Sequence, residues 1–316
     1  MICWPVFVVS AILFAAAVQA APTITRVLAT DVTPSGFSVV WQTSEPAGAG
    51  ISVYADANGT TEITTNFEVT YYPVHSGNPN SVENYQKSLD KDAITAATRA
   101  LGLVKVSVTG CKPATTYYFR VRAEAGGEAA VWPKAVPASV TTASENSFVG
   151  EARHLLLMLT NSGDNLNASG WLVTAASDGT RAPICEFVGD GVGTNQVYLN
   201  LSRMFAANGT NWTPEPGQKT IEIQMLGPGG SLLNQTVKVD FSGTFSVAAI
   251  DLLGLNIDSS MDGSQVTLAD VILALQVLVR INPPPGIRPV VDINGDGRVG
   301  IAEIINALQI LVELRQ

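Results

Sequence analysis

The sequence predicts a mostly β protein with two tandem β-sandwich domains and a small α-helical module at its C-terminal end. Short β-prone runs separated by turn residues fill residues 22–143 and 148–247. After residue 250, apolar residues recur at helical spacing instead. The length of 316 residues fits this division into two or three domains.

The composition is that of a folded, acidic protein. Hydrophobic residues make up 46% of the chain and charged residues 14%, so packed cores are expected. The formal net charge of −9 argues against nucleic acid as a partner, because nucleic-acid binding needs a basic surface. An acidic balance suits an exported protein or one that binds divalent cations.

The first 20 residues have the pattern of a secretory signal peptide. An apolar run over residues 2–17 is followed by Val18 and Ala20, which stand at positions minus three and minus one of a cleavage site after Ala20. No Lys or Arg precedes the run, and an uncleaved membrane anchor is the alternative. The run is shorter than the roughly 20 residues that a membrane span needs. We therefore expect a secreted or cell-surface protein with a cleaved signal peptide, residues 1–20.

Residues 22–143 are predicted to form the first sandwich. Its strand signals are β-branched and aromatic runs that alternate with turn pairs such as Asn58-Gly59; the runs cover residues 39–41, 51–54, 104–108 and 117–121. Several short strands at this spacing are typical of a β-sandwich.

This first segment resembles a fibronectin type III domain. Trp41 matches the tryptophan of the family's strand B, and Cys111-Lys-Pro-Ala-Thr-Thr-Tyr117 resembles its Leu-x-Pro-x-Thr-x-Tyr corner. The resemblance implies that the Tyr117 hydroxyl bonds to the backbone upstream, with Cys111 as a small core residue. It leaves out residues 62–102, an insertion with His75 and a predicted helix near residues 90–101. A binding loop and a decorative excursion both remain open for this insertion.

Residues 148–247 are predicted to form a second antiparallel sandwich, immunoglobulin-like by architecture only. Its strand signals cover residues 155–159, 171–174, 197–201, 220–225 and 237–241. Trp171 and Trp212 are candidates for a sugar-stacking platform, but packing in the core and against loops is favoured. Cys111 and Cys185 fall in different domains, so either an inter-domain disulfide or two buried free thiols is open, the second being favoured.

No recognisable catalytic set appears in the sequence. The histidines are His75 and His154, and His154 opens a β-run. The nucleophile elbow, the zinc-protease motif and the Walker loop are absent from the sequence. Acidic residues such as Glu186 and Asp190 cannot be paired from the sequence and are expected on the solvated surface. The sequence therefore predicts a protein without enzymatic activity.

A calcium-binding loop is the strongest chemical signal in the chain. The twelve residues 292–303 match the EF-hand loop, with Gly297 at the sharp turn of position six. Positions one, three, five, seven and twelve are Asp292, Asn294, Asp296, Arg298 and Glu303, and Arg298 would offer its backbone carbonyl. Ca²⁺ requires six to eight oxygen donors, and these residues supply them.

The same pattern occurs once before, as an internal repeat. The corresponding ligands of the first copy would be Asp258, Ser260, Asp262 and Asp270. One extra residue follows its glycine, so Asp270 falls at position thirteen, and Ser260 carries no charge. We therefore expect a weaker calcium site in this copy, because ligand charge and loop geometry tune affinity.

Two tandem loop–helix repeats of this size resemble a type I dockerin, and the resemblance covers roughly the last 60 residues. It implies a helical module at residues 250–316 that docks onto a cohesin-like partner through residues 267–280 and 301–314. Leu268, Ala269, Ile301 and Ala302 are apolar where cellulosomal members commonly carry Ser and Thr, so the identity of the partner stays open.

The first predicted helix is apolar nearly all round from Val271 to Val279. Such a helix requires cover on several faces, either from the second sandwich or from a partner.

These patterns together predict a secreted, non-catalytic modular protein that binds or adheres through a calcium-dependent docking module. The alternative is a carbohydrate-binding or hydrolytic component of a polysaccharide-degrading assembly. That alternative rests on analogy with the dockerin family rather than on site chemistry.

Overall fold

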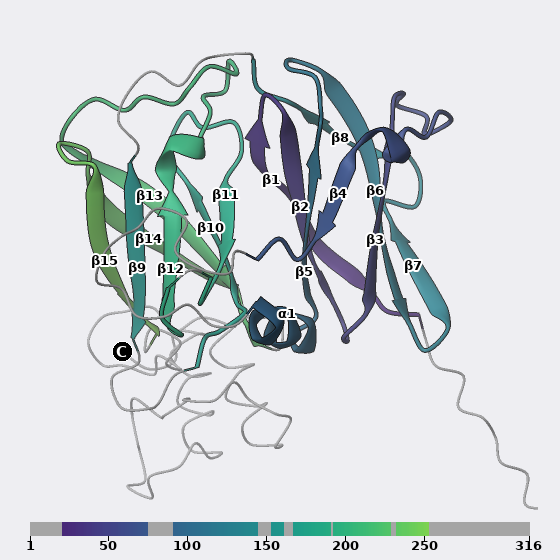
Figure 1. Ribbon diagram of the computed structural model, residues 1–316, viewed down its shortest axis with the longest axis horizontal. Helices are drawn as coiled ribbons and strands as arrows, with labels where there is room; N and C mark the ends of the chain where they lie inside the picture. Colours follow the sequence, from purple (N-terminus) through teal and green to yellow (C-terminus); the bar gives the residue numbers. More distant parts are fainter. Residues whose placement is uncertain are drawn as a thin grey trace, which may run out of the picture.

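The computed structural model describes residues 21–74, 91–144, 153–160, 167–190, 192–228 and 232–252. Within these ranges the protein is mostly β, with fifteen strands and one α-helix. The strands form two β-sandwiches that lie side by side (Figure 1). The predicted helical module lies outside the described residues except for its first three positions, residues 250–252.

The first sandwich consists of two four-stranded sheets. One has the order β1-β2-β5-β4 and the other the order β3-β6-β7, with β8 also paired to β6. The strands are β1 (Ile24–Thr33), β2 (Gly36–Thr43), β3 (Gly48–Tyr54), β4 (Glu68–Tyr71), β5 (Leu103–Thr109), β6 (Thr116–Ala125), β7 (Glu128–Trp132) and β8 (Ala138–Thr141). In chain order these sheets have the arrangements A-B-E-D and C-F-G, which are those of an immunoglobulin constant-type sandwich.

The residues that suggested this sandwich have the expected roles. Trp41 is fully buried in β2, and Cys111 is buried in the same core. The Tyr117 hydroxyl accepts a hydrogen bond from the backbone N–H of Lys112 at 2.8 Å, which confirms the predicted tyrosine corner. The strands predicted at residues 39–41, 51–54, 104–108 and 117–121 are all present.

Residues 62–102, taken from the sequence as an insertion, contribute three elements to this sandwich. β4 pairs with β5 as the edge strand of its sheet, and η1 (Thr64–Asn66) precedes it. The predicted helix is α1 (Lys91–Ala100), whose Ile94 is fully buried. Tyr72 is buried below the guanidinium of Arg99, 5.0 Å from ring centroid to Cζ. His75 lies outside the described residues.

The second sandwich has a four-stranded sheet of order β11-β10-β13-β14 and a three-stranded sheet of order β12-β9-β15. β15 pairs with β9 in parallel, whereas the other pairs are antiparallel. The elements are β9 (His154–Thr160), β10 (Leu172–Ala176), β11 (Ile184–Phe187), β12 (Gln196–Asn200), η2 (Leu201–Arg203), β13 (Gln218–Leu226), β14 (Leu232–Asp240) and β15 (Phe245–Asp251). These strands confirm the five that the sequence predicts here.

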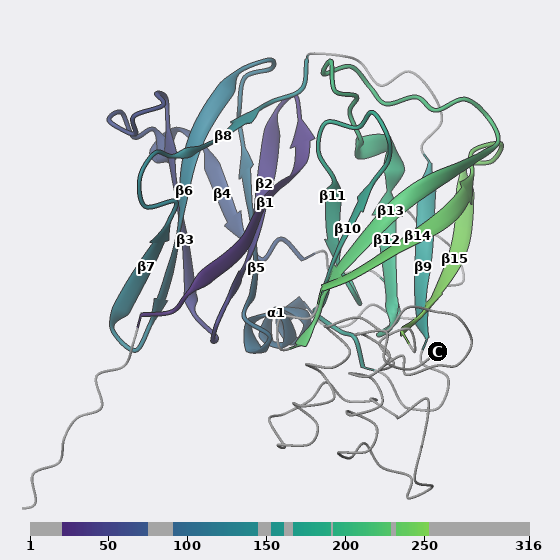
Figure 2. The ribbon, with the colours of Figure 1, turned by 180° about the vertical axis from the view of Figure 1, so that it is seen from behind.

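The core cluster of the first sandwich continues across the junction onto the facing sheet of the second sandwich, which has a separate core of its own. Leu172, Phe187 and Leu226 of the second sandwich belong to the same buried cluster as Trp41 of the first. Every residue of β2 is buried because one of its faces points into the first sandwich and the other toward the second. Both ribbon views place α1 at one end of this junction, below β5 (Figures 1 and 2).

Candidate functional site

The junction between the sandwiches is joined by hydrogen bonds from separate elements. The Asp31 N–H donates to the Pro183 carbonyl oxygen at 2.9 Å, and the Thr98 hydroxyl donates to the Gly170 carbonyl oxygen at 2.9 Å. A third bond runs from the Ser144 N–H to Gly209. Gly170 has a positive φ of 80°, and a Cβ at this position would lie 2.6 Å from the Thr98 backbone nitrogen. Helix α1 therefore packs directly on the backbone of the second sandwich.

Four charged side chains meet at the centre of the junction, and we call them the junction cluster. They are Asp31 of β1, Lys105 of β5, Glu186 of β11 and Arg203 of η2. Lys105 Nζ lies 3.1 Å from Asp31 Oδ2 and 3.7 Å from Glu186 Oε2. Arg203 lies 2.9 Å from Glu186 Oε1 and 3.5 Å from Asp31 Oδ1. Each cation therefore contacts both carboxylates, and the formal charges of the four groups cancel.

The cluster is also tied to the backbone of β11. Lys105 donates to the Cys185 carbonyl oxygen, and the Cys185 N–H donates to Asp31 Oδ1 at 3.2 Å. The side chains of Lys105 and Asp31 are only 3% and 2% exposed, whereas that of Arg203 is 39% exposed at the rim. Buried charges are stable only when they are paired and hydrogen-bonded, and this arrangement meets that condition.

The local sequence explains how β5 and β1 contribute to the cluster. The alternation of β5 places Val104 and Val106 in the core of the first sandwich and points Lys105 at the second. Asp31 has a φ of 51°, in the left-handed region that side chains other than glycine rarely adopt. The bonds to Pro183, Cys185 and Lys105 hold it there, so the surrounding junction stabilises this strained residue.

Electrostatics keep the central pair of the cluster charged. Burial disfavours the charged form of Asp31, but Lys105 and Arg203 outweigh it, and the pKa of Asp31 falls below its usual value. Burial likewise opposes the charge of Lys105, and its two carboxylate neighbours outweigh burial and raise its pKa. Glu186 differs, because burial, with added repulsion from Asp31 and Asp190, exceeds the attraction of its cations and raises its pKa.

These shifts decide what the junction can do chemically. An ammonium group whose pKa is raised does not act as a nucleophile at neutral pH. Both described cysteines, Cys111 and Cys185, are free and buried, so no disulfide joins them. Burial raises the pKa of Cys111 to about 11 and raises that of Cys185 as well, so both stay protonated and unreactive. The junction cluster therefore has the properties of a structural clamp.

The sequence did not predict this cluster, and the expected exposure of two acidic residues was wrong. Glu186 and Asp190 were expected on the solvated surface, yet both are buried. Glu186 is buried because the second sandwich packs against the first at this point, which no local pattern encodes. Asp31, Lys105 and Arg203 were not singled out at all. The one available signal was a lysine in the middle of the valine alternation of residues 104–108.

The tryptophans proposed as a sugar platform belong to the core instead. Trp171 is buried among the core residues of the second sandwich. Trp212 packs edge-on against Phe241, with ring centroids 5.4 Å apart. Trp171 is 5% exposed and Trp212 is half-buried against the same core, which agrees with the favoured interpretation of core and loop packing.

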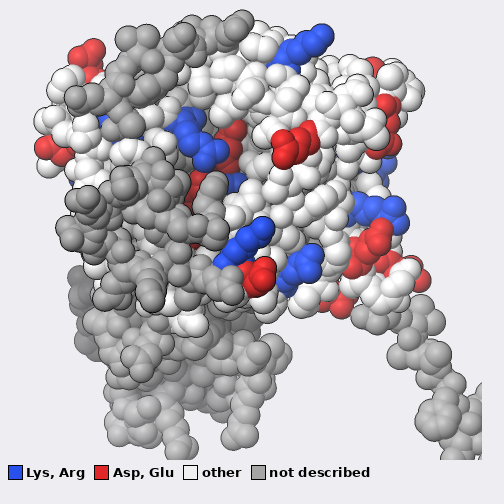
Figure 3. Space-filling model, viewed as in Figure 1, with Lys and Arg blue, Asp and Glu red and all other residues white. Residues whose placement is uncertain are grey.

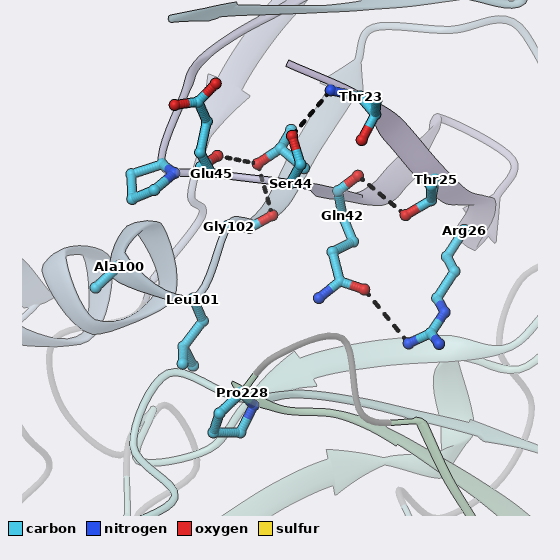
Figure 4. Close-up of a pocket in the computed structure, with 12 residues that line it drawn as sticks. Thr23, Thr25, Arg26, Gln42, Ser44, Glu45, Ala100, Leu101, Gly102 and Pro228 are labelled. Carbon is cyan, nitrogen blue, oxygen red and sulfur yellow. Dashed lines mark hydrogen bonds between the residues drawn. The ribbon is translucent and has the colours of Figure 1, made fainter. Parts of the chain in front are cut away.

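A surface pocket of about 620 Å³ opens beside the junction (Figure 4). Its lining is mostly polar on the side of the first sandwich, where the Arg26 guanidinium donates to Gln42 Oε1 at 3.3 Å. Leu101, just after α1, and Pro228, after β13, line the opposite side. Glu45 is the one carboxylate among the described lining residues. The pocket thus offers several hydrogen-bonding groups but a single acidic residue.

The predicted calcium ligands lie outside the described residues. These are Asp292, Asn294, Asp296, Arg298 and Glu303 of the second loop, with Asp258, Ser260, Asp262 and Asp270 of the first. Within the described ranges, no group of three or more His, Cys, Asp or Glu side chains is placed to hold a metal ion.

The described part of the chain contains no membrane-spanning helix, and the face shown in Figure 3 has no patch of charges of a single sign. No helix in the described part of the chain is long and apolar enough to cross a bilayer. In Figure 3, acidic and basic side chains are interspersed over the described surface.

Comparison with known proteins gives structural neighbours only. No protein-family model and no curated protein matches the chain. Solved structures similar to it include the titin domains Z1Z2 in complex with telethonin, at 14% identity and a TM-score of 0.21, covering 73% of this chain and 98% of that one. The tandem Ig repeats of Dlar match at 9% identity and a TM-score of 0.19, covering 73% and 100%. These scores are too low to carry an argument, so the sandwich architecture rests on the sheets described above.

Proposed function

We propose that this chain is a secreted, non-catalytic modular protein whose two sandwiches act as a rigid spacer for a calcium-dependent docking module at the C-terminal end. In this proposal the first sandwich is a fibronectin type III-like domain. Residues 250–316 form a dockerin-like pair of calcium loops and helices, and residues 1–20 are a cleaved signal peptide. Binding or adhesion, rather than turnover, is then the activity of the molecule.

The observation that carries the proposal is the loop over residues 292–303. Its donors are two aspartates, one asparagine, one backbone carbonyl and one terminal glutamate, an all-oxygen set that suits a hard cation. The donor types and their spacing therefore fit Ca²⁺. The bound ion would hold the loop in its turn and thereby order the helix that follows it.

The junction supports the spacer part of the proposal. Shared core residues, three backbone contacts and the junction cluster all fix one sandwich against the other. Domains joined by a small polar interface move relative to each other by default, whereas this junction combines buried apolar residues with charges that are paired to one another. A fixed tandem holds a terminal docking module at a defined distance from whatever the first sandwich contacts.

The test is calorimetric titration of Ca²⁺ into the mature chain, residues 21–316, with helicity followed by circular dichroism. We expect binding coupled to a gain of helix, because metal binding supplies folding free energy. Asp292→Ala should abolish binding at the second loop. Asp178→Ala, which removes an exposed carboxylate from a turn of the second sandwich, is the matched control and should bind like the wild type. Equal helicity in Ca²⁺ and in chelator would overturn the proposal.

The proposed partner is a cohesin-like protein that contacts residues 267–280 and 301–314. Nucleic acid is not expected as a partner, since the chain carries a net charge of −9. Pull-down of purified cohesin domains by the mature chain, with and without Ca²⁺, tests this part. Calcium-independent capture would show that the loops do not control docking.

The pocket beside the junction favours a second candidate function, carbohydrate binding. Its hydrogen-bonding side chains suit a hydroxyl-rich ligand, whereas hydrolysis requires a pair of carboxylates and the described lining has only Glu45. Affinity electrophoresis of the mature chain in a polysaccharide panel tests this candidate. Arg26→Ala should weaken any retardation, and Arg122→Ala, on the exposed surface of β6, should not. Migration unaffected by every polysaccharide would eliminate it.

A further inference from the structure

The three-stranded sheet of the second sandwich has an apolar outer face. In β9, Leu155, Leu157 and Leu159 point into the core, so the alternate residues of the strand point outward. The outward residues are His154, Leu156, Met158 and Thr160, so the middle of this strand is apolar on both faces. A strand of that kind is typical of a sheet that is covered on both sides.

The strand register extends this face across the whole sheet. Leu156 is paired with Tyr198 of β12 on one side and with Val247 of β15 on the other. Met158 pairs with Ala249, and Phe245 lies at the start of β15. Val247 is 53% exposed, and Met158 and Phe245 are each 37% exposed. We call Leu156, Met158, Tyr198, Phe245 and Val247 the outer-sheet face.

Leu156, at the centre of this face, is fully buried and Tyr198 is 8% exposed, so the exposed part of the face consists of Met158 on β9 with Phe245 and Val247 on β15. Leu156 forms a small buried cluster with Val192 and Tyr198. Val247 and Phe245, on the edge strand β15, remain among the most exposed large apolar side chains that the structure describes. Large apolar side chains that stay exposed on two neighbouring strands indicate an interaction surface.

The chain itself supplies an occupant of matching chemistry. β15 ends at Asp251 on this same sheet, and residues 253–316 follow directly. Within them, residues 271–279 contain Gln276 as their only polar residue, so the helix predicted over 267–280 needs apolar cover on several faces.

The dimensions also agree. A helix over residues 267–280 is about 21 Å long, close to the roughly 23 Å of a seven-residue strand. The connecting residues 253–266 span at most about 50 Å when extended, so this helix can reach any part of the sheet. Because the connection is intramolecular, the effective concentration of the segment at the face is high.

We propose that residues 267–280 dock as a helix on the outer-sheet face and anchor the first loop–helix repeat to the second sandwich. The second repeat, residues 292–314, then makes the partner contact alone, and residues 267–280 no longer belong to the partner surface proposed above. This inference rests on the proposed function in taking residues 267–280 as a helix, but it does not require calcium in either loop. It assigns the two repeats different roles, one as an internal anchor and the other as the docking element.

The experiment is hydrogen–deuterium exchange with mass spectrometry on the mature chain, in Ca²⁺ and in chelator. In the wild type, the amides of residues 267–280 should exchange slowly. Val247→Lys places a charge on the β15 side of the face, and exchange in 267–280 should rise at least about tenfold, since a buried unpaired charge costs about 1.4 kcal/mol or more. Val136→Lys is the matched control, because Val136 is 63% exposed in the first sandwich; it should leave this exchange unchanged.

A cysteine pair provides a second test that does not depend on whether Val247→Lys folds. Val247→Cys combined with Leu275→Cys should form an intramolecular disulfide under mild oxidation, whereas Val136→Cys combined with Leu275→Cys should not. The native thiols of Cys111 and Cys185 are buried and do not compete.

Three outcomes would overturn the inference. These are rapid exchange of residues 267–280 in the wild type, slow exchange that Val247→Lys does not change, and a concentration-dependent dimer that Val247→Lys dissolves. The last outcome would assign the face to a second copy of the chain. Calcium binding is measured in a separate titration. If residues 267–280 do not dock but calcium still binds, only this inference is rejected. Loss of calcium binding with docking intact rejects the proposed function alone.

Discussion

At the residue scale, Lys105 neutralises part of the negative charge of the buried carboxylates Asp31 and Glu186. Lys105→Met leaves Asp31 and Glu186 buried with only Arg203 between them. We expect the free energy of unfolding to fall by about 3 kcal/mol at neutral pH, the lower end of the range for breaking a buried pair. Urea denaturation followed by fluorescence measures this change. Lys134→Met, on an exposed loop, should change stability by less than about 0.5 kcal/mol.

The cause of the loss is tested by restoring the charge balance. Lys105→Met combined with Glu186→Gln leaves one cation and one anion, so part of the lost stability should return. The pKa of Glu186 is already raised by burial, so its side chain protonates readily once Lys105 is gone. Lys105→Met should therefore cost progressively less stability as the pH is lowered. Additive losses in the double variant would show that the two side chains do not interact.

A second residue-scale prediction concerns Asp56, in the loop after β3. Its carboxylate accepts backbone N–H bonds from Thr61 at 2.7 Å and from Thr60 and Asn58, and these bonds lower its pKa to about 2. Because the folded pKa lies below the unfolded value of about 3.9, its stabilisation is complete above that value. The stabilisation is lost as the pH falls through about 2.

Amide NMR gives the measurement for Asp56. The Thr61 N–H resonance should titrate with a midpoint near pH 2, and this step should vanish in Asp56→Asn. A midpoint near pH 4, the ordinary range for aspartate, would mean that the loop bonds do not favour the charged form.

At the element scale, α1 depends on a glycine of the other sandwich. Gly170 and Gly179 both have left-handed φ values, 80° and 78°, but a Cβ on Gly179 would meet nothing within 4 Å. Gly179→Ala should therefore cost only the backbone term of roughly 1 kcal/mol. Gly170→Ala should cost about 1–3 kcal/mol more, because its methyl would collide with Thr98. Urea denaturation of both variants measures the difference, and equal costs would refute direct packing of α1 on this backbone.

The elements could be predicted from sequence because their signals are local. Alternating runs such as residues 104–108 and turn pairs such as Asn58-Gly59 identify strands within a few residues, and the tyrosine corner joins positions only five residues apart. The candidate site could not be predicted in this way. Asp31 bonds to Cys185 across 154 residues, and Lys105 bonds to it across 80. The three-dimensional shapes of the two sandwiches decide which of their faces pack together. No periodicity in the sequence indicates this choice.

At the scale of the whole molecule, the shared core links the stability of the two sandwiches. The buried cluster that contains Trp41 also contains Phe187 and Leu226, so separating the sandwiches would expose core side chains from both. Separation would also leave Lys105 and Glu186 without each other and would break the α1 contact at Gly170. We therefore expect differential scanning calorimetry to show one cooperative transition for both sandwiches, rather than the two independent transitions typical of flexibly linked domains.

Calorimetry in Ca²⁺ and in chelator distinguishes the thermal transition of the two sandwiches from that of the docking module. Chelation of Ca²⁺ should remove any transition that belongs to residues 253–316 and leave the transition of the sandwiches in place, because within the described ranges no carboxylate group is placed to hold a metal. Lys105→Met combined with Gly170→Ala weakens the junction at two independent points, so the single transition should split into two. Two transitions in the wild type would contradict a rigid tandem and would leave the junction cluster as a contact between independently stable domains.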